Sequence, residues 1–147
     1  MAIKSAKSAT ARRKGAARLF TNAISRVLGV KLVSVGRKRL RARMRIKPLH
    51  INNAGRVNGG VLMAYADVVG AAATVANLEP GERTSTLESK TNFFAAGIGP
   101  VLTATSDLLH AGRTTMVWQT TIRNADGTRV AIVTQTQIRL PAKPSRD

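Results

Sequence analysis

The sequence predicts an α+β fold in which an antiparallel β-sheet wraps around one long central helix, with an extra helix at the N-terminus. Three observations predict this fold. Residues 59–77 contain one charged residue, Asp67, and no proline, as in a helix covered on several sides. After Pro80-Gly81, four segments of strand length follow one another, separated by glycine turns. Two shorter alternating segments precede the helix. With 147 residues, 44% of them hydrophobic, the chain is long enough for a single domain with its own core.

The N-terminal region is basic and then becomes helical in pattern. Residues 1–15 are small, polar and basic, and we expect them to be flexible. Apolar residues then recur at helical spacing, and Gly29 is a typical helix stop, so a helix is predicted over residues 16–29. The region also has the Arg-, Ser- and Ala-rich, acid-free composition of a mitochondrial transit peptide. We favour the structural helix, because it runs directly into strand signals without a linker.

Residues 31–35 and 37–46 alternate in polarity and predict a β-hairpin that turns near Gly36. In the second segment the apolar residues share one face. The cations share the other face: Arg39, Arg41, Arg43, Arg45 and Lys47. We interpret them as the solvated side of an antiparallel sheet, because a nucleic-acid surface usually interleaves aromatic residues for stacking and here there are none.

The long central helix is predicted to begin after Asn58 and to end near Asn77. Asn58 is a suitable N-cap, because its side-chain oxygen can accept an amide proton of the first turn. Gly59 and Gly60 let a ligand approach the backbone where amides and the helix dipole favour negative charge. Asp67 is expected to be buried in this apolar helix. A buried carboxylate is costly unless it is hydrogen-bonded, so Asp67 is a candidate for chemistry.

The rest of the chain predicts strands over residues 83–94, 101–110, 114–124 and 129–140. Gly97 and Gly99-Pro100, Ala111-Gly112, and Asp126-Gly127 mark the turns between them. Residues 141–147 are expected to be an unstructured tail. The predicted organisation is therefore one domain over residues 1–147, with its folded core over residues 30–140.

The charge is large and unevenly placed. Lys and Arg number 24 against 7 acids, giving +17, and no acid precedes Asp67. Such a field attracts nucleic acid, anionic lipid or phosphate-bearing small molecules, and charge alone does not choose among them. There is no cysteine, and His50 and His110 lie far apart, so no metal site is expected. No run has the length and apolarity of a membrane span and no secretory signal is visible, so a cytoplasmic protein is expected.

One set of residues carries a family resemblance. It comprises the glycine-rich segment with Asn52, Gly55, Asn58, Gly59 and Gly60, then Asp67, the segment Lys90–Phe94 and the segment Arg123–Gly127. Together with the order of elements, these residues make about residues 31–140 resemble the hotdog fold. More narrowly, the chain resembles the phenylacetic-acid-degradation (PaaI-type) branch of acyl-CoA thioesterases.

The resemblance implies hydrolysis of an acyl-CoA thioester and assigns roles to individual residues. The Gly59 amide would polarise the thioester carbonyl, and Asp67 would act as nucleophile or general base. Asn52 and a hydroxyl residue at the position of Thr86 would place the water or the thioester. The family's usual His before the glycine pair is Asn58 here, which keeps a cap and a donor but cannot titrate near neutral pH.

Substrate and cofactor expectations follow from the same resemblance. Gly60, Met63 and Phe93 are expected to line the site of the acyl group, which we expect to be aryl or of medium chain length. No metal or organic cofactor is implied, because coenzyme A is itself part of the substrate and a product.

The spacing of Gly59 and Asp67 predicts a homodimer. Eight residues of helix at ~1.5 Å each separate them by roughly 12 Å, so one thioester carbon cannot touch both within a single chain. A catalytic protein must then combine Gly59 of one subunit with Asp67 of another, and the family builds its sites at a dimer interface in this way. Pairing of dimers into tetramers stays open.

Two alternatives stay open at this level. A non-catalytic acyl-CoA or acyl-carrier-binding hotdog protein would explain the change from His to Asn at position 58. A basic protein that binds nucleic acid or an anionic membrane surface would explain the charge, and we do not favour it.

Overall fold

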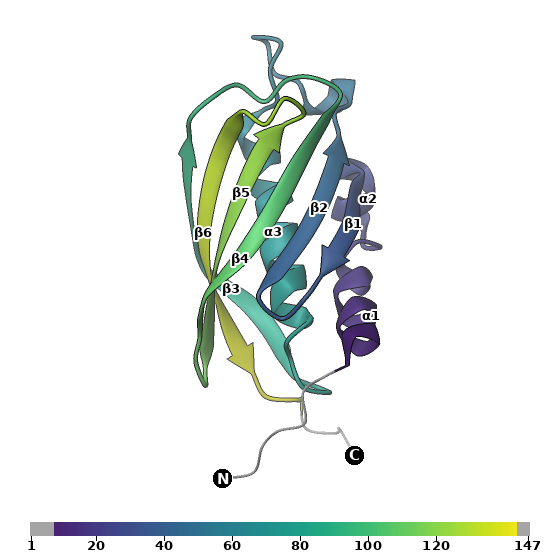
Figure 1. The fold of residues 1–147 in the computed structure, drawn as a ribbon, viewed down its shortest axis with the longest axis vertical. Helices are drawn as coiled ribbons and strands as arrows, with labels where there is room; N and C mark the ends of the chain where they lie inside the picture. The colour runs from purple at the N-terminus through teal and green to yellow at the C-terminus, as the bar shows by residue number, and fades with distance from the viewer. Residues whose placement is uncertain (1–7, 144–147) are drawn as a thin grey trace.

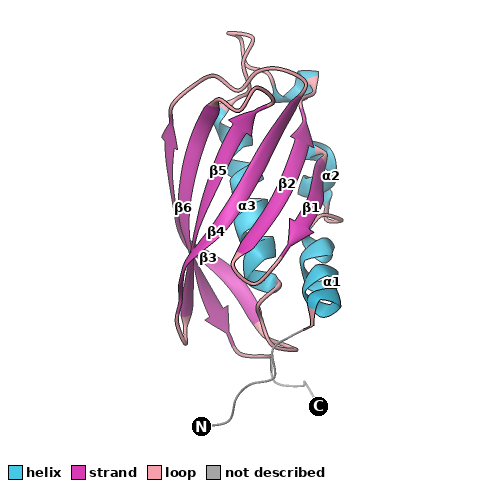
Figure 2. Cartoon of the chain, in the orientation of Figure 1, coloured by secondary structure: helices cyan, strands magenta, loops and turns pink. Residues whose placement is uncertain are grey.

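The computed structural model describes residues 8–143, which form helices and strands in the predicted order (Figures 1 and 2). The helices are α1 (Ala9–Leu19), α2 (Ala23–Leu28) and α3 (Gly59–Val75), with a short 3₁₀ helix, η1 (Pro48–His50). The strands are β1 (Val30–Val35), β2 (Arg39–Arg45), β3 (Arg83–Phe93), β4 (Val101–Ala111), β5 (Thr115–Asn124) and β6 (Arg129–Leu140). In the figures α3 lies along the inner side of the sheet, and α1 and α2 lie beside β1.

Within the described range the strands form a six-stranded antiparallel sheet in the order β1-β2-β4-β5-β6-β3. Its inner face packs on α3 with alternating buried residues, as Met116, Trp118 and Ile122 of β5 show. The predicted fold class, a hotdog sheet around a central helix, is therefore confirmed. The order also leaves β3 at one edge of the sheet and β1 at the other.

The N-terminal segment differs from the prediction of a flexible stretch followed by one helix. A helix already begins at Ala9, where the Ser8 hydroxyl accepts from the Ala11 amide at 3.1 Å. The chain then breaks, and α2 starts where the Asn22 side chain accepts from the Ser25 amide at 2.9 Å. Alanine-rich sequence favours helix, and α1 gains burial against α3 and β1, which explains the earlier start. Residues 1–7 and 144–147 of the predicted flexible ends lie outside the described residues.

The hairpin of β1 and β2 forms as predicted. Leu40, Ala42 and Met44 are buried, while the arginines between them are exposed. Gly29, with φ of 72°, ends α2 and leads the chain into β1.

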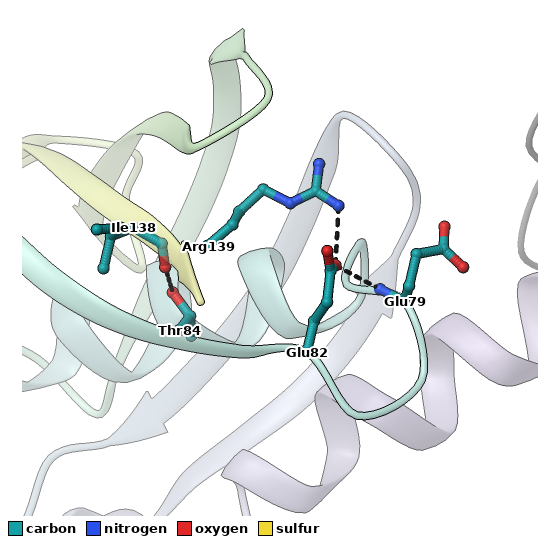
Figure 3. Close-up of polar contacts among 5 residues, drawn as sticks. All are labelled: Glu79, Glu82, Thr84, Ile138 and Arg139. Atoms are coloured by element: carbon teal, nitrogen blue, oxygen red, sulfur yellow. Dashed lines mark hydrogen bonds and ion pairs between the residues drawn. The ribbon is translucent and has the colours of Figure 1, made fainter. Parts of the chain in front are cut away.

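The connection from α3 to β3 is fastened to the end of β6 (Figure 3). The Glu82 carboxylate accepts from Arg139 Nη2 and from the Glu79 amide, both at 2.8 Å. The Thr84 hydroxyl donates to the Ile138 carbonyl at 2.8 Å. These contacts fix the start of β3 and so position the residues that follow on that strand beside α3.

Candidate active site

The N-terminus of α3 offers an unpaired amide. The Asn58 side-chain oxygen accepts from the Gly60 amide at 2.8 Å, so the predicted cap is confirmed. The Gly59 amide donates to no acceptor in residues 8–143. An open amide at the positive end of the helix dipole is suited to bind an oxygen that carries negative charge.

The Asp67 carboxylate is held by one of its two oxygens. Oδ1 accepts from the Thr86 hydroxyl at 3.0 Å and from Gln135 Nε2 at 3.2 Å. No donor within the described residues contacts Oδ2. Two donors on one oxygen fix the orientation of the carboxylate and leave the other oxygen available for a water or a substrate.

The expected burial of Asp67 is wrong for the single chain, because its residue is exposed. Gly60, Met63 and Asp67 follow each other at the spacing of one helical face, and all three are exposed. The sheet, α1 and α2 pack against the rest of α3 but leave this face open. The apolar composition of α3 therefore does not mean that this chain encloses the helix on all sides.

A second layer of buried side chains supports Thr86 and Asp67. Gln137 Nε2 donates to the Thr86 hydroxyl at 2.8 Å, and the Thr84 hydroxyl shares its one proton between the Ile138 carbonyl and Gln137 Oε1, the latter at 3.0 Å. Gln135 and Gln137 are both buried. Neither glutamine was predicted from the sequence. Both alternate with Val133 along β6, so two amide side chains at inward-facing positions of the strand could have indicated them.

Gly70 makes room for Gln135. A Cβ atom at Gly70 would lie 2.1 Å from Gln135 Oε1, far inside van der Waals contact. The missing side chain on α3 thus lets Gln135 pack flat against the helix and reach Asp67.

Asn52 and Phe93 lie near the start of α3 rather than near Asp67. The Asn52 side-chain oxygen accepts from the Ala54 and Arg56 amides at 2.9 and 3.2 Å and closes the loop before α3. Asn52, Gly59 and Phe93 line one surface depression. The Phe93 ring lies over Gly59, since a Cβ there would be 3.2 Å from the ring.

The structure therefore places the predicted site residues in two separate groups. Asn52, Asn58, Gly59 and Phe93 surround the N-terminus of α3, whereas Thr86 meets Asp67 further along the helix. Gly60 and Met63 lie on α3 between them. Eight residues of helix, roughly 12 Å, keep the Gly59 amide and the Asp67 carboxylate apart.

His50 supports the loop that carries the first group. Its Nδ1 accepts from the Lys47 amide at 3.1 Å, and its carbonyl accepts from the Asn58 amide at 2.8 Å. Burial lowers the pKa of the imidazole, and the nearby charge of Lys47 lowers it further. His50 is thus a neutral structural residue at neutral pH.

Within residues 8–143 no group of His, Cys, Asp and Glu side chains is arranged to hold a metal ion. Over the same residues no helix has the length and apolarity needed to cross a membrane.

Comparison with known proteins adds independent information. The family model of the thioesterase superfamily matches residues 54–131. A 1,4-dihydroxy-2-naphthoyl-CoA hydrolase of Listeria monocytogenes is 25% identical over 96 residues, which cover 65% of this chain and 78% of that protein.

Solved structures share the fold over most of their length. The PaaI protein from the phenylacetic acid degradation operon of E. coli superposes with a TM-score of 0.84 at 22% identity, covering 92% of this chain and 97% of that one. A thioesterase from Haemophilus influenzae gives a TM-score of 0.82 at 23% identity, covering 88% and 91%. A conserved protein from Pseudomonas aeruginosa gives 0.77 at 27% identity, covering 84% and 98%.

Proposed function

The chain belongs to the thioesterase superfamily and is a thioester hydrolase, and from this premise we propose that it hydrolyses acyl-coenzyme A at a site formed by Gly59 and Asp67. The observation that carries the proposal is the state of the Asp67 carboxylate. One oxygen is fixed by Thr86 and Gln135, and the other is free. Two donors hold the carboxylate in a fixed orientation, and its free oxygen lies on an exposed helix face that a water or a substrate can reach.

The proposed reaction uses the two groups together. The thioester carbonyl oxygen accepts a hydrogen bond from the free Gly59 amide. This bond stabilises the negative charge that develops on the oxygen as the carbonyl carbon is attacked. Asp67 Oδ2 either takes a proton from the attacking water or attacks the carbon itself to give an anhydride that water then hydrolyses. The carbon–sulfur bond breaks and coenzyme A leaves as the thiol. Its sulfur takes the proton that Asp67 removed from the water or, in the direct route, a proton from the solvent. No metal or organic cofactor is needed for these steps.

We propose that two subunits complete each site. The separation along α3 excludes a single-chain site, and the outer edge of β3 has no partner strand within residues 8–143. An exposed edge of 11 residues is a surface that proteins usually cover. Large apolar side chains lie exposed on or near it: Met63, Leu87 and Phe93 at 42%, 60% and 52%. Pairing of two β3 edges in a homodimer would cover this surface and set the two α3 helices antiparallel.

We propose an aryl or medium-chain acyl group bound along the exposed face of α3. Gly60 and Met63 line that face, and Phe93 borders the depression beside Gly59. The names of two similar proteins favour an aryl group, since one hydrolyses a naphthoyl-CoA and the other comes from a phenylacetic acid operon. A cytoplasmic location stays a prediction from the sequence.

The direct test is steady-state hydrolysis of a panel of aryl and aliphatic acyl-CoAs by wild type and Asp67→Asn. We expect turnover of at least one substrate and a loss in kcat of about 100-fold or more in the variant, as for removal of a catalytic base. Glu79→Gln is the control, because Glu79 lies in the connection between α3 and β3, away from the proposed site, and its carboxylate forms no hydrogen bond or ion pair within residues 8–143.

Two results would contradict the mechanism: no turnover of any substrate by wild type, or an Asp67→Asn variant as active as wild type. Tight acyl-CoA binding without turnover would instead support a non-catalytic binding protein. Asn58 in place of the family's His is the observation that keeps that second candidate in view.

A further inference from the structure

A basic pocket of about 650 Å³ lies at the opposite edge of the sheet from β3, between α2, β1, β2 and the start of β4. Gly29, Pro100 and Val101 form part of its wall. The other lining residues are cations from three elements and the loop that follows β2: Arg26, Lys31, Arg43, Arg45 and Lys47. No carboxylate lines the pocket.

The fold brings these cations together in a defined way. Lys31 of β1 lies directly across from Arg43 of β2 in the antiparallel register, and Arg45 follows on the same face of β2. Lys47 Nζ reaches back to donate to the Val27 carbonyl at 3.3 Å, near the end of α2. A Cβ at Gly29 would lie 2.8 Å from this ammonium group, so glycine at the turn gives Lys47 its space.

The charge of the pocket is not neutralised by the protein. The ion pairs within residues 8–143 are Arg39–Asp107 and Arg139–Glu82, and neither involves a pocket residue. Like charges directly opposite each other on a sheet destabilise it. A bound anion would relieve this repulsion between Lys31 and Arg43.

We propose that this pocket binds the phosphate groups of a small phosphorylated molecule. Several cations converging on one hollow suit a pyrophosphate or two neighbouring phosphates, and the volume is in the range of ligand pockets. No aromatic residue lines it, which disfavours stacking of single-stranded nucleic acid. The proposal does not depend on the proposed thioesterase reaction.

Two sources supply this chemistry. One is the nucleotide end of the acyl-CoA substrate, which carries a pyrophosphate and a ribose phosphate. The other is a free phosphorylated ligand that binds apart from catalysis. Both need the same cations, and kinetics with two kinds of substrate separates them.

The binding test is calorimetry on the full chain with pyrophosphate and with adenosine 3′,5′-bisphosphate as probes. We expect wild type to bind, with affinity that falls as salt rises. The double variant Arg43→Gln/Arg45→Gln is expected to weaken binding by roughly tenfold or more, because it removes two charge-assisted contacts. The control is Arg41→Gln, which lies on the same exposed face of β2 but outside the pocket and is expected to change the affinity by about twofold at most.

Two outcomes would overturn the proposal: no binding of either probe by wild type at millimolar concentration, or a loss in Arg41→Gln equal to that in the double variant. The second outcome would mean that the overall charge, and not the pocket, attracts the anion. A thermal melt checks folding, and the double variant is expected to melt at or above the wild-type temperature since it relieves like-charge repulsion.

Kinetics with two substrates distinguishes the two sources of phosphate. One substrate is an acyl-CoA, and the other carries the same acyl group on pantetheine, which has no phosphate. A raised KM for acyl-CoA alone, with kcat unchanged, in the double variant identifies the substrate's nucleotide as the occupant. Unchanged KM for both substrates, together with lost bisphosphate binding, identifies a free ligand. Both results support phosphate binding in the pocket. If the protein hydrolysed neither substrate, the calorimetric test of phosphate binding would still apply.

Discussion

Asn58 caps the N-terminus of α3 with a side chain that does not ionise. Its oxygen accepts from the Gly60 amide, and this leaves the Gly59 amide free. We predict that Asn58→Ala lowers the free energy of unfolding by about 1 kcal/mol, as loss of an N-cap does. Asn58→Ser is the conservative control and is expected to keep most of the stability. Urea unfolding monitored through Trp118 measures both, and an Ala variant as stable as wild type would contradict the role of the cap.

The position of the Gln135 side chain requires a glycine at position 70, because a Cβ atom there would overlap its amide. In Gly70→Ala the new methyl group displaces the Gln135 amide and breaks its 3.2 Å bond to Asp67. We predict a lower kcat with little change in KM, because the carboxylate loses a positioning donor. Overpacking against a buried side chain is expected to lower stability by about 1–3 kcal/mol as well. Steady-state kinetics and urea unfolding measure the two effects.

A double-mutant cycle tests the pairing itself. In a Gln135→Ala background the clash is gone, so Gly70→Ala is expected to have little further effect on stability or turnover. Effects that simply add would show that Gly70 acts independently of Gln135.

At this scale the sequence could supply the motif residues but not their supporting layer. The family resemblance pointed to Thr86 as a residue that places the water or the thioester, and the structure joins its hydroxyl to Asp67 by a hydrogen bond. Gln135 and Gln137 follow no motif, because an amide on a strand acquires its role only from the helix packed above it. The exposure of Asp67 was also missed, since the composition of α3 does not say which face the rest of the chain leaves open.

The loop from Lys47 to Asn58 is the element that fixes the start of α3, and His50 holds it. Its pKa is lowered in the fold, so the folded protein resists the proton that the unfolded chain accepts below about pH 6.5. Stability therefore rises with pH between the lowered pKa and the ordinary value, and is lost as pH falls through that window.

We predict that wild type loses free energy of unfolding on acidification through this window and that His50→Asn shows a smaller dependence. Asparagine places an acceptor near the position of Nδ1 for the Lys47 amide but cannot take up a proton. Urea unfolding at a series of pH values measures the slopes. Equal slopes in the two proteins would exclude His50 as the titrating group.

The strands were easier to predict than the N-terminal helices, for a physical reason. Glycine turns such as Asp126-Gly127, where Gly127 has φ of 89°, stop strands at defined places, so β6 agrees with its predicted range. In the segment before β1 the helical spacing continues across Thr21 and Asn22. The break there depends on Asn22 capping a new helix, which periodicity alone does not reveal.

The whole molecule presents two separate regions on opposite edges of one sheet. The β3 edge, with the open face of α3, carries the candidate active-site residues, and the β1 edge carries the basic pocket. Part of the net charge of +17 is therefore concentrated in this basic pocket. One chain keeps the Gly59 amide and the Asp67 carboxylate roughly 12 Å apart, so the proposed function depends on the proposed assembly.

Complementation between two inactive variants tests this assembly. Asp67→Asn removes the carboxylate, and Gly59→Val crowds the open amide against Phe93, whose ring already lies 3.2 Å from a Cβ at that position. If each site takes Gly59 from one subunit and Asp67 from the other, a mixed dimer has one intact site and one doubly damaged site. Equal amounts of the two variants, unfolded and refolded together, are then expected to recover about a quarter of wild-type activity, because half of the dimers are mixed. Refolding each variant alone is the control. A site within one chain recovers no activity on mixing, so a mixture no more active than its parts would refute the composite site while leaving the superfamily assignment in place.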